Sequence, residues 1–399
     1  MQSKYQFSRL EFSGSLGDLG TLLPLALGLI LVNGLSPNGV FLSVGLFFIF
    51  SGLYFGVTVP IQPMKVISAY AIATAMTAPQ ITASGYLIGL VLLVIGTTGA
   101  ITAIGKYIPK SVVRGVQVST GTLLTVEGIK FMLGTTRLQV LRQAAEPYLS
   151  INSVGPVPVG IIIGLAGGLL TLLLLDNKKF PAGAVVVLGG IALGLIFGIR
   201  AGLDKINPGI HLPQFLPLGW PTKADFTFAL FALVLPQIPM TLGNAVIAYA
   251  DLSKDYFGDN SKKITYKSVC VSMALANLVS STIGGMPLCH GAGGLAAHYR
   301  FGARSAGSNL MIGGIFVVLA LALGDGSLAV IYLLPLSVLG ILLLFAGSQL
   351  ALTIMDLKNR KDFFVVLFML GITLASNLAA GFMVGIGLAY LLKSERLQV

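Results

Sequence analysis

Charged residues are scarce in this sequence. Only 10% of its 399 residues are Asp, Glu, Lys or Arg, whereas 55% are hydrophobic. Soluble domains carry about 25% charged residues, so this scarcity excludes an ordinary soluble domain and indicates a polytopic membrane protein surrounded by the lipid bilayer. The net charge is +11. In a membrane protein an excess of Lys and Arg marks the cytoplasmic loops, so this charge does not indicate a nucleic acid partner, and we expect none.

Cysteine is nearly absent, and so are the motifs of several enzyme classes. Cys270 and Cys289 both lie in apolar segments and imply no disulfide framework. Cys289 and His290 are adjacent but lack the further ligands of a tetrahedral metal site, so we expect no metal and no other cofactor. The sequence has no P-loop, no catalytic triad spacing and no H-E-x-x-H helix. These absences exclude ATP-driven transport by this polypeptide alone and argue against an enzyme.

Apolar segments of membrane-spanning or near-spanning length are abundant. A first set of seven lies at about residues 15–33, 37–57, 62–78, 81–104, 111–134, 156–175 and 181–199. A second set of seven lies at about residues 227–250, 267–283, 288–300, 306–323, 328–355, 361–375 and 377–393. We therefore predict an all-α polytopic membrane protein of about 14 spans, with a first repeat at 1–205, an extracellular or periplasmic linker at 206–226 and a second repeat at 227–399.

Lys and Arg are distributed unevenly over the predicted loops. With the N-terminus inside, 18 of them fall on the inner side, 6 on the outer side, and Lys65 remains within the membrane, which accounts for all 25. Because cytoplasmic loops carry an excess of Lys and Arg, we predict a multi-pass protein of the inner or plasma membrane with both termini cytoplasmic. No small-residue cleavage pattern follows the first dozen residues, so no cleavable signal peptide is expected.

The two sets of segments are similar in sequence pattern. LLPLALGL (22–29) aligns with VLPQIPMTLGNAVIAYA (234–250), which matches Pro24 to Pro236. FGVTVPIQPMKVISAYAIA (55–73) aligns with STIGGMPLCHGAGGLAAHY (281–299), which matches Pro63 to Pro287. Seven spans per half, an odd number, make the halves inverted relative to each other. Interrupted segments at corresponding positions of two halves are the best sequence pointer to a transporter's binding site.

The first interrupted segment contains Gln62, Pro63, Met64 and Lys65. Pro60 and Pro63 hold the chain extended, and Pro63 suits the first turn of a following helix. A charged side chain at this depth is costly and usually functional, so Lys65 is a candidate for an anion site. The alternatives are that Lys65 snorkels to an interface or pairs with a carboxylate.

The second interrupted segment contains Cys289, His290, Gly291, Ala292 and Gly293 after a break at Gly284, Gly285 and Pro287. The first N–H groups of a helix that restarts here have no partner within the helix and attract negative charge. Small residues let a ligand approach the backbone, and His290 could donate a further hydrogen bond. The alternatives are a tight helix crossing that needs glycine and a satisfied buried histidine.

Other polar groups lie within apolar spans and need partners. Gln237 directly follows Pro236, and we predict that it belongs to the substrate site. Asp18 could pair with Lys65, take part in proton coupling or cap the first helix. Glu127 could couple ion movement or make a structural hydrogen bond between helices.

Four stretches carry a family resemblance. SGSLGDLGTLLPLALGLILVNGL, VPIQPMKVISAYAIA, LPQIPMTLGNAVIA and GGMPLCHGAGGLAAHYRFGARS closely resemble the signature stretches of the molybdate transporter family, which is related to the sulfate permeases. The resemblance implies the seven-plus-seven inverted repeat shared by sulfate permeases and uracil permease. It places a core domain at about 13–104 and 227–323 and a gate domain at about 110–199 and 328–393, and it implies a homodimer through the gate helices.

The residues and the resemblance together indicate a secondary active transporter for molybdate, a tetrahedral oxyanion, with a co-transported proton as a hypothesis. Two helix N-termini and Lys65 would suit such a dianion. Tungstate and sulfate remain alternatives because charge and geometry do not separate them. A nucleobase carrier would want carboxylates in the broken segments, and an anion channel would need a continuous wet path.

Overall fold

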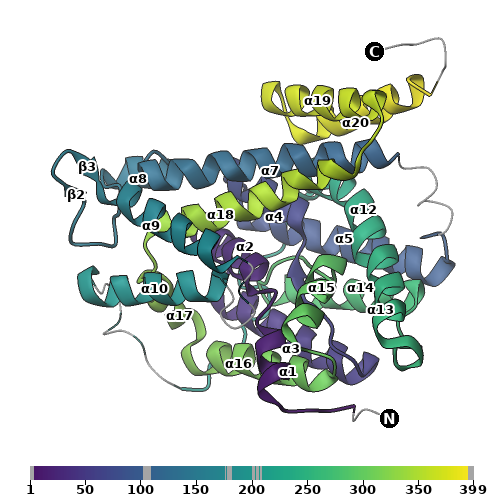
Figure 1. Ribbon diagram of the computed structural model, residues 1–399, viewed down its shortest axis with the longest axis horizontal. Coiled ribbons are helices and arrows are strands. Elements are labelled where there is room, and N and C mark those ends of the chain that lie inside the picture. The colour runs from purple at the N-terminus through teal and green to yellow at the C-terminus, as the bar shows by residue number, and fades with distance from the viewer. Residues whose placement is uncertain are drawn as a thin grey trace.

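The computed structural model describes residues 4–101, 109–175, 177, 182–199, 203, 206 and 209–393. Helices account for most of this part of the chain (Figure 1). The first half contains α1 (Arg9–Ser15), α2 (Leu19–Leu31), α3 (Pro37–Phe55), β1 (Gln62–Pro63), α4 (Lys65–Thr74), α5 (Ala78–Thr98), α7 (Lys110–Leu133), α8 (Arg137–Arg142), β2 (Ser153–Val154), β3 (Val157–Pro158), α9 (Val159–Leu174) and α10 (Ala182–Phe197).

The second half repeats one pattern of the first, a helix and then a short strand that leads into a short helix. It contains α11 (Lys223–Ala229), α12 (Leu235–Met240), α13 (Tyr249–Phe257), α14 (Tyr266–Thr282), β4 (Leu288–Cys289), α15 (Ala292–Phe301), α16 (Ala306–Leu323), α17 (Ser327–Ile331), α18 (Leu336–Ala351), α19 (Arg360–Ala375) and α20 (Leu378–Leu391). Two π-helical segments, Leu230–Val234 and Thr241–Ala248, join α11, α12 and α13.

Each of the fourteen predicted apolar segments contains a helix. Among the described residues, five helical stretches are long and apolar enough to cross a membrane: Pro37–Phe55, Ala78–Thr98, Lys223–Ser261, Ala306–Ile331 and Leu336–Asp356. The bent pair α1 and α2 adds a sixth. The protein is therefore helical with several spans, and the count of fourteen crossings stays a prediction.

Two predicted segments differ from the structure in length. The segment 328–355 is interrupted after Ile331, and α18 starts behind Pro335, whose missing N–H cannot continue a helix. The segment 227–250 belongs to a 39-residue helix, Lys223–Ser261. Pro236 and Pro239 do not end this helix, because π-helical turns on both sides of α12 absorb the altered hydrogen-bond register.

Some sequence predictions lie outside the described residues. Six of the Lys and Arg residues counted for the predicted membrane orientation are among them, namely Lys106, Lys178, Lys179, Arg200, Lys205 and Arg396. So are the end of the segment 81–104 from residue 102 onward, the first residue of the segment 181–199, and residues 207 and 208 of the predicted linker.

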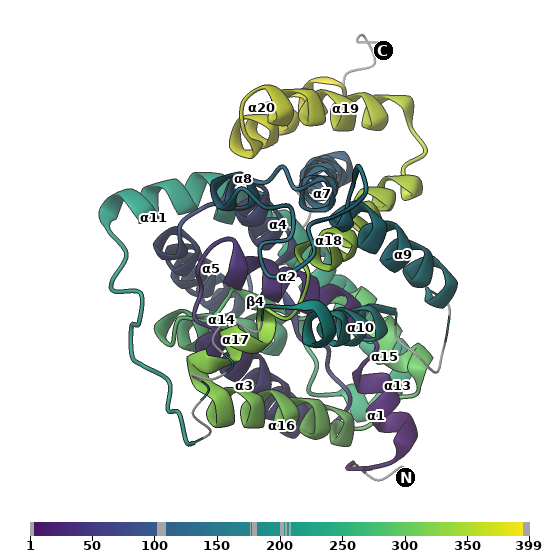
Figure 2. The same cartoon turned by 90° about the vertical axis from the view of Figure 1, so that its left-hand side faces the viewer.

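The helices form two groups. In Figures 1 and 2, α7 and α18 lie side by side, and α19 and α20 lie against α7 on the side away from α18. We call α7, α9, α10, α18, α19 and α20 the α7 group, since they contact one another. We call α2, α3, α4, α5 and α11 to α16 the broken-helix group, because both strand–helix segments belong to it. α2, α4 and α12 contact members of the α7 group, so the two groups meet along these helices.

Glycine lets paired helices touch backbone to backbone. A Cβ added at Gly121 of α7 would lie 2.5 Å from the carbonyl oxygen of Gly347 of α18, and a Cβ at Gly347 would lie 2.5 Å from the carbonyl oxygen of Gly121. Gly128 and Gly340 form a second reciprocal pair one heptad away, at 2.4 and 2.6 Å. This close approach, typical of membrane helices, accounts for part of the 50 glycines.

Candidate functional site

The two interrupted segments meet at the centre of the broken-helix group. β1 pairs antiparallel with β4, with Gln62 opposite Cys289 and Pro63 opposite Leu288. The Met64 N–H also donates to the Pro287 carbonyl at 2.9 Å. The chain reaches β4 through Gly284, whose φ of 76° favours glycine. The prediction that the two broken segments lie together is confirmed, and each strand leads into a short helix, α4 or α15.

Two buried asparagines tie these segments to neighbouring helices. The Asn277 side chain of α14 accepts from the Leu288 N–H at 2.9 Å and donates to the Leu288 carbonyl at 2.8 Å. The Asn309 side chain of α16 does the same for Val59, just before β1, with both distances 2.8 Å. The Asn277 amide supplements the two-residue strand β4, and the Asn309 amide holds the extended chain before β1, so buried backbone groups are satisfied in both places.

The N-terminus of α4 is closed by a side chain. The Gln237 Oε1 atom accepts from the N–H groups of Val66 and Ile67 at 3.0 and 3.2 Å, and Gln237 Nε2 donates to Thr241 Oγ1 at 2.9 Å. Gln237 therefore has protein partners at both ends of its amide. Its oxygen holds the two N–H groups that an anion would otherwise contact at this helix end.

The N-terminus of α15 is open. Gly291 is its N-cap residue and, having no side chain, makes no capping hydrogen bond. Within the part of the chain that the structure describes, no side chain accepts from the N–H groups of Ala292, Gly293 or Gly294. A helix end of this kind attracts an anion through its free N–H groups and its dipole.

Asp18 lies next to this open helix end, at the 45° bend between α1 and α2. Its Oδ1 atom accepts from Gln62 Nε2 at 2.6 Å, and its Oδ2 atom is buried and has no hydrogen-bond partner among the described residues. A Cβ added at Gly294 would lie 2.7 Å from Asp18 Oδ2, so the carboxylate sits against the first turn of α15. Asp18 is the N-cap residue of α2 but makes no side-chain capping bond.

A cavity of about 360 Å³ lies where the two helix groups meet. The broken-helix group lines it with Gly17, Gly20, Thr21, Leu25, Lys65, Ala69, Met240, Asn244, Gly293 and Phe301. The α7 group and the residues flanking its helices line it with Gln117, Leu124, Thr171, Leu175, Ala182, Gly183, Leu342, Phe345, Ala346, Gln349, Leu350 and Thr353. Among these lining residues Lys65 is the one charged side chain, and six others carry a hydroxyl or an amide.

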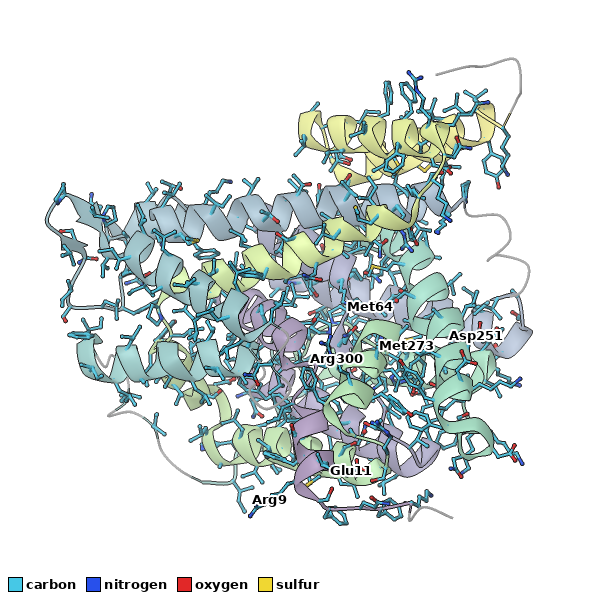
Figure 3. All side chains as sticks on the ribbon, in the orientation of Figure 1. Arg9, Glu11, Met64, Asp251, Met273 and Arg300 are labelled. Atoms are coloured by element: carbon cyan, nitrogen blue, oxygen red, sulfur yellow. The ribbon has the colours of Figure 1, made fainter. Side chains whose placement is uncertain are left out.

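Two of the predicted substrate-site residues, Lys65 and Gly293, line this cavity. Lys65 is the first residue of α4, and Gly293 belongs to the open first turn of α15. The others are not part of the lining, and all but the half-buried Ala292 are buried; they are Gln62, Pro63, Met64, Gln237, Cys289, His290, Gly291 and Ala292. Figure 3 shows Met64 in the interior of the molecule, in agreement with its complete burial.

His290 is fully buried and has protein partners at both ring nitrogens. Its Nδ1 lies 3.1 Å from the Pro60 carbonyl oxygen and its Nε2 lies 3.1 Å from Ser272 Oγ. Because a carbonyl oxygen only accepts, Nδ1 carries a proton and donates it to Pro60. The imidazole thus links the two interrupted segments, and in this conformation neither ring nitrogen is free for a ligand.

Glu127 of α7 lies away from the cavity lining and forms an ion pair with Lys130 at 3.3 Å. The polar lining residues that sequence reasoning did not assign to the site are Thr21, Gln117, Thr171, Asn244, Gln349 and Thr353. Their signal was an uncharged polar side chain within an apolar span. The described residues contain no group of three or more His, Cys, Asp or Glu side chains that could hold a metal ion.

Two solved structures with the same fold are named in their titles as a bicarbonate transporter and an anion transporter. The chain matches the transmembrane domain of a cyanobacterial bicarbonate transporter, BicA, with a TM-score of 0.67, 17% identity and coverage of 94% of this chain and 97% of that one. It matches the murine Slc26a9 anion transporter in the inward-facing state with a TM-score of 0.69, 16% identity and coverage of 100% and 70%. At such low identity the likeness shows the fold alone.

Sequence relatives are closer. Molybdate transporter 2 of Arabidopsis thaliana is 32% identical over 97% of this chain and 88% of its own length, and molybdate transporter 1 of the same plant is 30% identical over 94% and 86%. Molybdate transporter 1 of Chlamydomonas reinhardtii is 28% identical over 94% and 90%. The family described as "Molybdate transporter of MFS superfamily" matches residues 10–124 and 229–350, which contain both interrupted segments. The chain belongs to the molybdate transporter family.

Proposed function

We propose that this protein is a secondary active transporter that moves molybdate across the membrane, and that the oxyanion binds in the cavity between Lys65 and the open N-terminus of α15. The observation that carries this proposal is the charge of the cavity: its described lining has one cationic side chain and no acidic one. The relatives are named as molybdate transporters, and we infer the identity of the substrate from them.

The electrostatics of the cavity suit a tetrahedral dianion. A helix N-terminus acts like about half a positive charge, and Lys65 adds a full one at the start of α4. Asn244 and Thr21 of the broken-helix group and Gln117 and Gln349 of the α7 group offer hydrogen bonds to several oxygens at once. Gln62, Pro63, Met64, Gln237, Cys289, His290, Gly291 and Ala292 then position the two helix ends. Selectivity over sulfate must come from the spacing of these donors.

The proposal includes the membrane architecture. We infer a fourteen-span inverted repeat in the inner or plasma membrane, with both termini cytoplasmic. The core, at about 13–104 and 227–323, corresponds to the broken-helix group, and the gate, at about 110–199 and 328–393, corresponds to the α7 group and mediates a homodimer. Movement of one group past the other would expose the cavity alternately to each side, which distinguishes a carrier from a channel.

Asp18 is the residue that we propose for proton coupling. Its carboxylate occupies the same helix end that the oxyanion would approach, so a charged Asp18 repels the substrate and a protonated Asp18 does not. Proton and oxyanion binding are then linked, and each favours the other by the same factor. Glu127, the other candidate, has its own cation in Lys130 and lies off the cavity.

The function is tested by uptake of labelled molybdate into proteoliposomes that contain the full chain. Saturable accumulation against a gradient, displaced by tungstate and only weakly by sulfate or uracil, is expected. Complete inhibition by excess sulfate without inhibition by tungstate would show that molybdate is not the substrate. Uptake that only equilibrates and does not saturate would indicate an anion channel.

Coupling is tested separately by imposing an inward proton gradient. Wild-type uptake is expected to rise with the gradient, whereas Asp18→Asn should transport molybdate without responding to it. Glu127→Gln provides the matched removal of a carboxylate and should behave as wild type. A gradient response that survives in Asp18→Asn would remove Asp18 from the coupling step.

A further inference from the structure

A second cavity lies on the outside of the broken-helix group, between α3 and α14. It is a groove of about 840 Å³. One wall is a stripe of α3 at helical spacing (Ser43, Leu46, Phe47, Phe50, Ser51 and Tyr54), and the other is a stripe of α14 (Ser268, Val271, Ser272, Leu275, Ala276 and Val279). Phe50, Tyr54, Leu275 and Val279 are between 51 and 64% exposed, so the groove faces outward with an apolar surface.

The groove has the length of one membrane leaflet. On α3 the stripe runs from Ser43 to Tyr54, and on α14 from Ser268 to Val279. Each stripe covers twelve residues, and eleven steps of about 1.5 Å span roughly 16 Å, while half of a hydrocarbon core of about 30 Å is about 15 Å. A single acyl chain that enters at one end can therefore lie along the whole groove.

One end of the groove is cationic. Lys262, Lys263 and Lys267 line it there, and the Lys263 ammonium lies 5.2 Å from the ring centre of Tyr54. Among the described residues, Asp259 is the one acid that forms an ion pair with this cluster, at 3.3 Å from Lys262, and both side chains are largely exposed, so the pairing is weak.

Beside the lysines lies a polar hollow of about 360 Å³, which shares Lys262 and Lys263 with the groove and adds Lys4 and Arg304. Three lysines within six residues of sequence repel one another, and an anionic group placed among them would relieve that repulsion. The sequence-based orientation puts this end on the cytoplasmic side, where anionic lipids attract basic residues.

We propose that this groove binds one anionic phospholipid, with an acyl chain between α3 and α14 and the phosphate among Lys262, Lys263 and Lys267. Charge complementarity at one end, an apolar surface along the rest and a length of one leaflet together fit this ligand. The proposal does not depend on which anion the transporter carries.

The inner wall of the groove reaches the centre of the molecule. Ser272 lines the groove, and its Oγ lies 3.1 Å from His290 Nε2. Phe47 also lines it, and its ring centre is 4.8 Å from that of His290. His290 in turn donates to the Pro60 carbonyl, next to β1. A bound acyl chain therefore supports the two side chains that hold the joint between the interrupted segments.

The test is native mass spectrometry of the full chain released from detergent with added phosphatidylglycerol or phosphatidylcholine. The wild type is expected to retain one phosphatidylglycerol in preference to phosphatidylcholine. The triple variant Lys262→Gln, Lys263→Gln, Lys267→Gln should lose about tenfold in apparent affinity, a change of about 1.4 kcal/mol. Ala276→Phe fills the groove without altering the charge and should lose the same lipid.

The control variant Lys254→Gln, Lys358→Gln, Lys393→Gln removes the same charge from positions outside the groove lining and should keep the wild-type preference. Equal retention of the two lipids by the wild type would overturn the proposal. So would an equal loss in the control variant, or undiminished binding in both groove variants. Molybdate uptake by the wild type and the groove variants is measured in parallel. If the lipid site is wrong, lipid retention fails the test while uptake is seen; if the transport assignment is wrong, uptake is absent while lipid retention can still follow the expectation.

Discussion

Lys65 is the residue on which substrate charge recognition rests. It begins α4, it is the one charged side chain among the described lining residues of the central cavity, and it forms no ion pair within 4.0 Å in the described chain. The Asp18 carboxylate acts on Lys65 electrostatically but lies outside ion-pair distance, and a cation held at this depth without a contacting counter-ion is costly. An anion that binds beside Lys65 offsets that cost, so binding of the anionic substrate is favoured at this position.

We predict that Lys65→Gln weakens molybdate binding by about tenfold, since removing a charge from a partly buried pair costs at least about 1.4 kcal/mol. Lys65→Arg should retain most of the affinity. Isothermal titration of the purified protein measures the effect directly. Lys223→Gln, a charge removal outside the cavity lining, should leave binding unchanged, and equal affinity of Lys65→Gln and wild type would exclude a direct role.

Gln237 permits a prediction that separates stability from affinity. Gln237→Ala removes the acceptor from Val66 and Ile67 and should lower the free energy of unfolding by about 1 kcal/mol, as the loss of a helix cap does. Gln237→Glu keeps an acceptor oxygen but adds a negative charge beside Lys65, so it should preserve stability and reduce oxyanion affinity. Thermal unfolding in detergent and binding titration measure the two quantities. If Gln237→Ala keeps the stability of the wild type, or if Gln237→Glu loses stability and keeps its oxyanion affinity, the capping role is contradicted.

The short strand–helix segments are the elements that make the site, and their existence was predictable while their contacts were not. Proline and glycine act locally, so Pro63, Gly284 and Pro287 reveal the breaks in the sequence itself. The cap on α4 joins positions 171 residues apart and the His290 bond to Pro60 joins positions 230 apart. Such contacts depend on how helices dock, which local residue preference does not encode.

The adjacent glycines Gly293 and Gly294 at the start of α15 should respond differently to the same substitution. A Cβ at Gly294 would lie 2.7 Å from atoms of Asp18, Gln62 and Pro60, whereas a Cβ at Gly293 meets nothing within 4 Å. Gly294→Ala should therefore destabilise the protein by about 1–3 kcal/mol, the usual cost of overpacking. Gly293→Ala should fold normally and lower substrate affinity, because its methyl group enters the cavity. Unfolding temperature and molybdate binding distinguish them, and equal stability of the two variants would contradict this geometry.

At the scale of the whole molecule, the cavity exists because two helix groups meet without filling the space between them. The sequence identified the broken-helix side, because its breaks are visible. It did not identify the lining from the α7 group, because the polar side chains of these helices do not by themselves show which helix face meets the other group. Gln117 and Thr353 are examples: their direction toward the cavity follows from the crossing of α7 and α18.

On the cavity wall the two groups approach each other closely at Gly20 of α2 and Gly183 of α10. A Cβ at Gly183 would lie 2.6 Å from the Gly20 Cα. A large side chain at Gly183 is incompatible with the present arrangement of the groups but would be accommodated if α2 and α10 separate. Gly183→Leu should therefore shift the population toward a second conformation in which α2 and α10 are separated. The ratio of the two conformations should change by about tenfold for each 1.4 kcal/mol by which the clash destabilises the present one.

Spin labels on Leu90→Cys of α5 and Leu173→Cys of α9 report the separation of the groups. Both positions are exposed, at 56 and 71%, and both native cysteines are buried, so labelling is confined to the new sites. Gly183→Leu should change the distance distribution and slow molybdate turnover while the protein stays folded. Gly189→Leu, on the same helix but with nothing within 4 Å of its added Cβ, should match the wild type. If Gly183→Leu folds and keeps both the wild-type distances and the wild-type turnover, the two groups do not move past each other at this contact.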